Sequence, residues 1–415
     1  MNTKPVPIPE GDQLKAFISG RHRAAQVWQS LFLLATCVGI VVLTALLYNV
    51  LDSAFGLVAL ADKVDAATIS ERPLEDLSKD ELVTILQANI SRGAYNKLEN
   101  EQPFARRSRD DVYGLILERV LQREVKGAWT LTESLFQRAE IEQELAEDKD
   151  LQGATLAFRS WITPEFITTP MSSKPAYTGV RTAVLGSLVL VSLAILIALP
   201  IGVGGAVYLN EYASKSFVYR LIETNIYNLS GVPSIVYGML GLAVFVRVLE
   251  SFTSGSIFGV TDTNGRTILS AAMTMAILIL PIIIVNSQEA IKAVPDTFRQ
   301  ASYGLGATRW QTIWNHVLPN SLPGILTGSI LAISRAIGET APLVVVGAST
   351  FITVDPNNVF SKFTALPIQI YVWTSRPQPG FHNVAAAAIV ALLLLLLTMN
   401  ATAIILRNRF SRRAY

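Results

Sequence analysis

Hydrophobic residues are gathered in long, uninterrupted blocks along this chain, and polar residues fill the segments between the blocks. Six blocks carry almost no charge over roughly 20 positions or more, the length at which a helix crosses about 30 Å of hydrocarbon. The first block is too long for the apolar region of a signal peptide, so we expect it to remain as a span. The pattern predicts six transmembrane helices, at Leu31–Leu51, Thr182–Leu209, Thr224–Val246, Thr267–Val285, Leu322–Val346 and Val384–Leu406.

The overall composition agrees with this pattern. Of the 415 residues, 51% are hydrophobic and 16% are charged, whereas a soluble domain has about 25% charged residues. We therefore expect an all-α polytopic membrane protein. Between the second and third blocks, residues 217–228 form a short amphipathic stretch, which we expect to lie at the membrane surface.

The longest polar segment, residues 52–179, separates the first two spans and is called the insert below. It contains 22 acidic and 15 basic residues. Ser78 with Glu81 and Ser108 with Asp111 have the spacing of capping boxes, which predicts a small helical domain. Two roles stay open for it, a solvated spacer or a docking surface for a partner. Its acidic excess argues against a substrate site for an anion.

The short loops differ in their content of lysine and arginine, which sets membrane orientation. With the N-terminus inside, the cytoplasmic segments hold thirteen such residues and the short external loops hold four. We therefore expect both termini in the cytoplasm. The thirteen are Lys4, Lys15, Arg21, Arg23, Lys215, Arg220, Lys292, Arg299, Arg309, Arg407, Arg409, Arg412 and Arg413; the four are Arg247, Arg266, Lys362 and Arg376.

Cysteine and histidine are too few and too scattered to indicate metal or redox chemistry. Cys37 is the only cysteine, so no intramolecular disulfide can form. His22, His316 and His382 lie in different segments, and a transition-metal site would need such residues grouped.

The loop after the fourth span, residues 287–320, is the most informative part of the chain. Pro295 suits the start of a helix, and Gly304 and Gly306 allow a sharp reversal near Tyr303. A second helix is then predicted from Thr308, whose spacing to Gln311 is that of a capping box.

This second helix carries two tryptophans on one apolar face. Trp310, Ile313, Trp314 and Val317 recur at helical spacing, and Pro319 with Pro323 is expected to close the helix. Such a face is suited to a groove on a partner; the alternative is a connector lying on lipid, for which more lysine and arginine would be expected.

The same loop resembles the coupling loop of ABC-importer permeases, written Glu-Ala-Ala, three residues, Gly, nine residues, then Ile, any residue, Leu-Pro. Gln300 replaces the usual Glu of that pattern, and His316 replaces its Ile. The resemblance implies that the loop docks into a cleft of a separate ATPase subunit, which moves the membrane helices. The matching positions are Gln300, Ala301, Ser302, Gly306, Leu318 and Pro319.

The chain itself contains no G-x-x-x-x-G-K-[ST] phosphate loop. Its glycine-rich run at 202–205 lies inside an apolar block without the required lysine, and we expect these glycines to permit close packing between membrane helices. ATP hydrolysis is therefore expected of a partner, and the chain needs no cofactor of its own.

The fifth apolar block contains a charge pair, Arg335 and Glu339. Arg335 lies about 18 Å along a helix from Pro323, near the bilayer centre, where an isolated arginine is costly. Glu339 falls on the same helical face four residues later. Two interpretations compete: a structural ion pair, or a site where the guanidinium receives an oxyanion and the carboxylate holds it when the site is empty.

Three neighbouring segments carry a second resemblance. "SRAIGETAPL" (334–343), "NLSGVPSIVYGMLGL" (228–242) and "LPIGVGGAVYLNEYA" (199–213) are similar to phosphate permeases of the PstA type, and "EFITTPMSS" (165–173) is similar to their first external loop. This implies the type I ABC importer permease fold, with Arg335 and Glu339 in the phosphate path and Thr340 and Ser334 as further hydrogen-bonding candidates. It also implies a homologous second permease, an ATPase dimer and an extracytoplasmic phosphate-binding protein.

The chain is thus divided into a cytoplasmic segment 1–30, a first span 31–51, an extracytoplasmic insert 52–179, a permease core 180–409 and a cytoplasmic tail 410–415. We expect a phosphate-translocating subunit of the bacterial inner membrane, without catalytic residues and without a nucleic-acid partner. Import of another oxyanion, such as sulfate or molybdate, and a membrane sensor that signals through the insert remain as alternatives.

Overall fold

A computed structural model describes residues 11–64, 68–70, 72–101, 103–149, 151, 153–260 and 264–411. The chain divides into two units, residues 1–52 and 53–415, which are described separately. The first unit contains the helix α1 (Asp12–Ser53), which includes the predicted first span but begins well before it. Residues 1–10 and 412–415, which include parts of both predicted cytoplasmic segments, lie outside the described residues.

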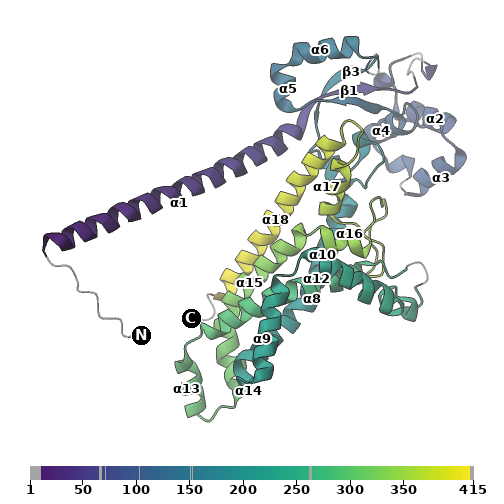
Figure 1. Ribbon diagram of the computed structural model, residues 1–415. Coiled ribbons are helices and arrows are strands. Elements are labelled where there is room, and N and C mark those ends of the chain that lie inside the picture. Colours follow the sequence, from purple (N-terminus) through teal and green to yellow (C-terminus); the bar gives the residue numbers. More distant parts are fainter. Residues whose placement is uncertain are drawn as a thin grey trace. The chain divides into compact units, whose positions relative to one another are not determined.

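In the second unit, four long apolar helices correspond to predicted spans (Figure 1). The second, fourth and sixth spans are confirmed as helices, with ends that differ by a few residues. The helices are α8 (Arg181–Val207), extended by a π-helical turn Tyr208–Tyr212, α12 (Ile268–Lys292), α15 (Leu318–Gly338) and α18 (Phe381–Ser411).

The third predicted span is wrong as a single straight helix. The helix α9 (Phe217–Ser230) and the helix α10 (Ser234–Gly241), which continues as a π-helical segment Leu242–Val248, meet at an angle of 105°. Pro233 disfavours a helical conformation of the residue before it, which accounts for the break. Residues 224–230 therefore belong to the amphipathic helix that precedes the span.

The membrane helices share one core. The helices α8, α10, α12 and α15 contribute buried residues to it, together with the short α16 (Ala341–Val346) and α17 (Leu366–Thr374). Small residues bring these helices close: a Cβ atom added at Gly241 would lie 2.1 Å from Thr274 Oγ1, and one at Gly328 would lie 2.3 Å from Asn286 Cβ. The core packing therefore depends on glycines inside apolar blocks.

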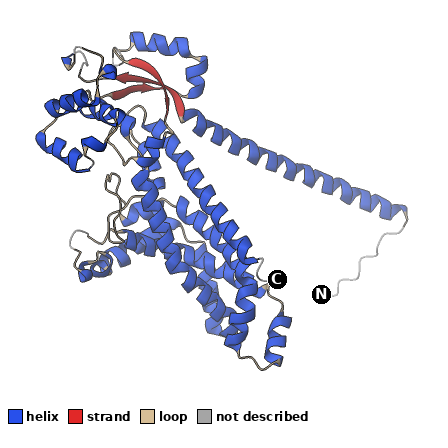
Figure 2. Cartoon of the chain, turned by 180° about the vertical axis from the view of Figure 1, so that it is seen from behind, coloured by secondary structure: helices blue, strands red, loops and turns tan. Residues whose placement is uncertain are grey.

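The insert contains the expected helices and, in addition, a three-stranded antiparallel sheet, so the prediction of a helical domain was incomplete (Figure 2). The central strand is an apolar run directly after the first span. Its composition alone does not distinguish this run from a continuation of the span. The order is β2-β1-β3, with Val58 opposite Ala128 and Ala157. The strands are β1 (Phe55–Ala61), β2 (Glu124–Ala128) and β3 (Thr155–Ser160).

Helices cover the remainder of the insert. Both predicted capping boxes are confirmed, at Ser78 and at Ser108. The helices of the insert are α2 (Lys79–Asn89), α3 (Arg92–Glu101), α4 (Arg109–Arg119), α5 (Leu131–Phe136), α6 (Arg138–Glu147) and α7 (Pro164–Thr168). The 3-10 turns of the insert are Leu74–Asp76, Phe104–Arg106 and Pro175–Tyr177. Outside the insert, the loop after the third span contains the short helix α11 (Glu250–Thr253) and the 3-10 turn Ser256–Phe258.

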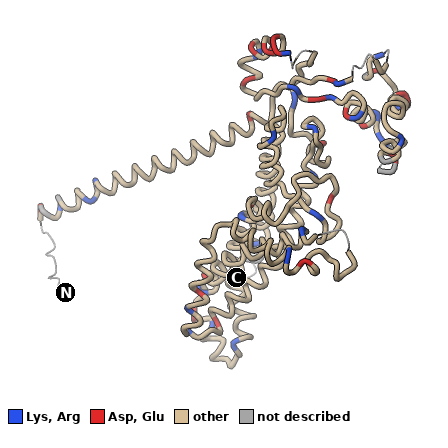
Figure 3. The backbone as a smooth tube through the Cα atoms, turned by 45° about the vertical axis from the view of Figure 1, so that its right-hand side comes forward, with Lys and Arg blue, Asp and Glu red and all other residues tan. Residues whose placement is uncertain are grey.

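The insert has its own core and also packs on the membrane helices. Leu82, Leu86, Val112 and Ile116 are fully buried between α2 and α4. A second cluster joins the sheet to α17 and α18, with Trp161 beside residues such as Phe381. Charged residues are dense in the insert and sparse along the long helices of this unit (Figure 3). The sheet is therefore part of the permease unit rather than a tethered module.

The glycine-rich run at 202–205 provides a direct test of helix packing. A Cβ atom at Gly202 would lie 2.6 Å from Ile283 Cγ2 on α12, whereas one at Gly204 would meet nothing within 4 Å. We expect Gly202→Ala to cost about 1–3 kcal/mol, because the Ile283 side chain must move within a packed core. Gly204→Ala is the matched control. The measurement is the thermal unfolding midpoint in detergent, and equal midpoints for the two variants would contradict this packing.

Candidate functional site

The fifth predicted span is interrupted beside its charge pair. The helix α15 ends at Gly338, Glu339 adopts an extended backbone with φ −76° and ψ 121°, and α16 begins at Ala341. Pro342 explains the break, since its ring would clash with the carbonyl of Gly338 in a continuous helix. A residue in the left-handed region, Gly347, ends α16. The predicted span 322–346 therefore consists of two helices, and the irregular backbone lies between Gly338 and Pro342, which flank Glu339 of the charge pair.

Arg335 and Glu339 meet at this break. The guanidinium Nε of Arg335 lies 3.2 Å from Glu339 Oε1, in the last turn of α15, where a cation is favoured by the helix dipole. The side chains are 39% and 19% exposed. The guanidinium of Arg335 is thus paired with one carboxylate, and more than a third of its side chain stays exposed in this chain.

The two weaker candidates lie differently. Ser334 Oγ donates to the Ile330 carbonyl (2.9 Å) and lies 2.8 Å from Asn400 Oδ1 on α18. Thr340 is the N-cap residue of α16 but its side chain makes no capping hydrogen bond. The contact with Asn400 already satisfies the Ser334 hydroxyl within the protein. The substrate-path roles of Ser334 and Thr340 stay predictions.

A groove of about 580 Å³ between α12 and α15 also includes Ser334, but not Arg335. Asn286, Glu289 and Thr327 are its other side chains with hydrogen-bonding groups. Sequence reasoning missed Asn400, an amide inside the sixth apolar block, and Asn286, an amide directly after the fourth, although polar residues are costly in membrane helices and often functional.

The coupling loop forms two helices around a glycine turn, as predicted. The helix α13 (Asp296–Gly304) begins directly after Pro295, and Gly306 has φ +82°. The Thr308–Gln311 capping box is present at the start of α14 (Arg309–Thr312). The hydroxyls of Ser302 and Thr312 lie 2.8 Å apart and are buried, so they hold the two helices together.

Pro319 and Pro323 do not close the second helix, as had been predicted. A π-helical turn, Ile313–Val317, joins α14 to α15, and the helix continues from Arg309 to Gly338. Pro319 lacks an N–H group and its ring would clash with the carbonyl four residues earlier, and the wider π-helical turn accommodates both effects. The coupling segment is therefore continuous with the span that carries Arg335.

The predicted apolar face of this helix is divided into two edges. Ile313 and Val317 are fully buried against the C-terminal ends of α8 and α12. Trp310 and Trp314 are 56% and 59% exposed, and their rings stack with centroids 5.5 Å apart. One edge thus anchors the helix and the other is exposed. We call the exposed apolar residues here the docking patch: Phe298, Tyr303, Leu305, Trp310 and Trp314.

Among the other coupling-loop positions, Gln300 and Ala301 are exposed on α13. Leu318 is half-buried and Pro319 is exposed, at the junction with α15. The positions that match the coupling pattern therefore lie on one contiguous segment beside the docking patch.

A buried ion pair that sequence reasoning missed fixes α13 to the end of α8. Arg299 Nη2 lies 2.8 Å from Glu211 Oε1 in the π-helical turn after α8, and the side chains are 14% and 8% exposed. Arg299 also donates to the carbonyls of Val294 (2.8 Å) and Ile291 (3.1 Å). Burial alone would lower the pKa of the guanidinium, but hydrogen bonds to Glu211 and its charge raise the pKa.

We expect Glu211→Gln to lower the thermal unfolding midpoint, at a cost of up to about 3–5 kcal/mol, because the buried Arg299 then keeps only the exposed carboxylate of Asp296, 3.2 Å from its Nη1, as a counter-charge. The exchanged pair Glu211→Arg with Arg299→Glu should restore part of the loss. Lys292→Gln breaks an exposed pair with Glu289 and should change the midpoint little. A Glu211→Gln protein as stable as Lys292→Gln would show that the pair does not hold α13.

The chain is similar in sequence to known transport proteins. A model of the family described as "binding-protein-dependent transport system inner membrane component" matches residues 198–414. The chain is 33% identical over 223 residues to a probable ABC transporter permease protein, YqgI, of Bacillus subtilis, covering 51% of this chain and 71% of YqgI. It is 35% identical over 238 residues to the phosphate transport system permease protein PstA 1 of Mycobacterium tuberculosis, covering 57% and 72%.

Among solved structures, the chain is similar to a bacterial alginate ABC transporter in complex with an alginate pentasaccharide-bound periplasmic protein. The TM-score is 0.45 at 17% identity, covering 67% of this chain and 90% of the other. The family model spans just over half of the chain, including the coupling segment and the Arg335–Glu339 break. This protein belongs to the family of binding-protein-dependent transport system inner membrane components.

Proposed function

We propose that this chain is one of two pore-forming permeases of an ATP-driven importer that carries inorganic phosphate across the bacterial cytoplasmic membrane. The observation that carries the proposal is the Arg335–Glu339 pair at the break between α15 and α16, with a partly exposed guanidinium. The similarity to a protein named as a phosphate transport permease supports phosphate as the substrate.

Arg335 would act as a reversible anion receptor. A guanidinium offers a planar fork of N–H donors that matches two phosphate oxygens. One of these donors, the Nε–H of Arg335, lies 3.2 Å from Glu339 Oε1 and bonds to it. An arriving phosphate replaces the Glu339 carboxylate beside Arg335. When the phosphate leaves, the carboxylate pairs with the guanidinium again. The positive charge of Arg335 therefore always has an anionic partner, and the phosphate can still be released.

The docking patch and the continuous helix from Arg309 to Gly338 would transmit the work of ATP hydrolysis. Stacked, exposed tryptophans are strong candidates for interface anchors. Because the coupling segment and Arg335 belong to one helix, a movement imposed by an ATPase dimer would reach the anion site directly. The remaining partners are a homologous permease and an extracytoplasmic phosphate-binding protein, with both termini of this chain in the cytoplasm. This subunit performs no covalent chemistry.

The test is uptake of radiolabelled phosphate by proteoliposomes that contain the complete importer. We expect ATP-dependent uptake that requires the binding protein and that excess sulfate or molybdate does not reduce. Stronger competition by sulfate or molybdate than by unlabelled phosphate would reassign the substrate. ATP hydrolysis without phosphate movement, with every partner present, would instead favour a membrane sensor that uses the insert.

A further inference from the structure

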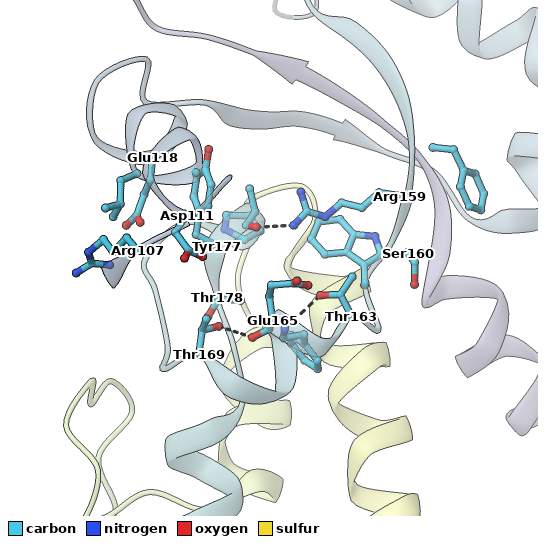
Figure 4. Close-up of a pocket in the computed structure, with 17 residues that line it drawn as sticks. Arg107, Asp111, Glu118, Arg159, Ser160, Thr163, Glu165, Thr169, Tyr177 and Thr178 are labelled. Atoms are coloured by element: carbon cyan, nitrogen blue, oxygen red, sulfur yellow. Dashed lines mark hydrogen bonds between the residues drawn. The ribbon is translucent and has the colours of Figure 1, made fainter. Parts of the chain in front are cut away.

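The insert contains a pocket of about 560 Å³ that has no part in the transport path described above. Its walls come from α4, β3, α7 and the 3-10 turn before α8 (Figure 4). Phe158, Trp161 and Phe166 supply apolar surface, and Trp161 and Phe166 are buried. The family model begins only at residue 198, beyond all of these residues.

One cation in this pocket lacks an anionic partner. Arg159 extends from β3 across the pocket and donates to the carbonyl of Ala176, and its Cζ lies 4.7 Å from the Trp161 ring centroid (Figure 4). Within the part of the chain that the structure describes, Arg159 forms no salt bridge. Burial lowers the pKa of its guanidinium.

Most N–H donors of Arg159 therefore remain for a ligand. A guanidinium has five such donors, and a half-buried charge without a counter-charge is unfavourable. An anionic oxygen beside Arg159 would remove this cost, and the Trp161 ring already orients the guanidinium.

Carboxylates on the other walls decide which anion can enter. Asp111, Glu118 and Glu165 line the pocket, together with Arg107. Asp111 is engaged in its capping box and Glu118 lies 3.5 Å from Arg119. Glu165, which Figure 4 places on α7 below Arg159, takes part in no described ion pair. Three carboxylates would repel free phosphate, whereas a ligand that also carries an ammonium group would pair with them.

We propose that this pocket binds a phosphoethanolamine group, with its phosphate on Arg159 and its ammonium on Glu165. The favoured source is the headgroup of phosphatidylethanolamine, because Thr178 on the pocket wall lies only three residues before Arg181, where α8 begins the apolar span. The site would thus recognise a lipid at the end of the span, and the proposal does not depend on phosphate as the transported substrate.

The experiment is native mass spectrometry of the full-length chain in detergent with added phosphatidylethanolamine or phosphatidylglycerol. We expect the chain to retain phosphatidylethanolamine preferentially, and Arg159→Gln to reduce this retention by about tenfold. Arg138→Gln removes an exposed arginine that pairs with Glu142, so it serves as the matched control and should retain lipid as the unaltered chain does.

A second variant separates recognition from folding. Glu165→Gln keeps Arg159 but removes the partner of the ammonium, so the preference should shift toward phosphatidylglycerol, a change that misfolding would not produce. Free phosphoethanolamine should compete with the lipid; if it binds where the lipid does not, the same site serves a soluble ligand. Equal lipid retention by Arg159→Gln and Arg138→Gln, or an unchanged preference in Glu165→Gln, would overturn the proposal.

Discussion

Replacing Arg335 with Gln is expected to lower phosphate uptake by roughly a hundredfold or more, while the importer should still assemble. The expected size reflects the loss of two charge-assisted hydrogen bonds to phosphate. Uptake by proteoliposomes measures the effect, and co-purification of the partners measures assembly. Arg247→Gln, which alters an exposed arginine at the end of the third span, is the matched control and should transport normally.

Glu339 distinguishes an anion receptor from a structural ion pair. If Glu339 competes with phosphate for Arg335, Glu339→Gln should lower the phosphate concentration that gives half-maximal uptake, because the competitor is removed. If the pair only holds helices together, the double variant Arg335→Gln with Glu339→Gln should recover uptake, since neither charge is then left unpaired. Recovery in that double variant would exclude Arg335 from the substrate path.

The second large effect is expected at the docking patch. Replacing Trp310 and Trp314 together with Ser should reduce the amount of ATPase that co-purifies with the complex by about a hundredfold, because aromatic anchors dominate interface energies. Both rings are more than half exposed, so the isolated chain should keep its thermal unfolding midpoint. Ile313 and Val317 remain to anchor the helix.

The control for this variant is another stacked, exposed aromatic pair. Trp28 and Phe32 on α1 have ring centroids 5.9 Å apart, and replacing both with Ser should leave the ATPase attached. A complex that keeps its ATPase without Trp310 and Trp314 would contradict the assignment of the docking patch, and uptake would then have to be coupled through other contacts.

Local signals in the sequence predicted local structure well. The capping boxes at Ser78, Ser108 and Thr308 are present. A capping box forms wherever the helix lies, because the hydroxyl and the residue three positions later each bind the other's backbone N–H group. The pairing of Arg335 with Glu339 is likewise local, since Glu339 is the fourth residue after Arg335 and directly follows the helix that carries it.

Long-range pairings could not be predicted in this way. Glu211 and Arg299 are 88 residues apart, and neither spacing nor periodicity relates them, although Glu211 was visible as a charge at the end of an apolar block. The central strand β1 was missed because its apolar run becomes a strand only through pairing with β2 and β3.

By itself, the sequence determined that this is a helical membrane protein. It also determined the charge pair in the fifth apolar block and the tryptophan-bearing loop before that block. These features follow from residues that are neighbours along the chain, because a membrane helix satisfies its backbone hydrogen bonds within itself. Tertiary structure decided that the loop and the fifth span form one helix, and which apolar side chains of that helix stay exposed. Those outcomes depend on contacts between distant segments: Ile313 is buried and Trp314 is open only because α8 and α12 cover one edge of their helix.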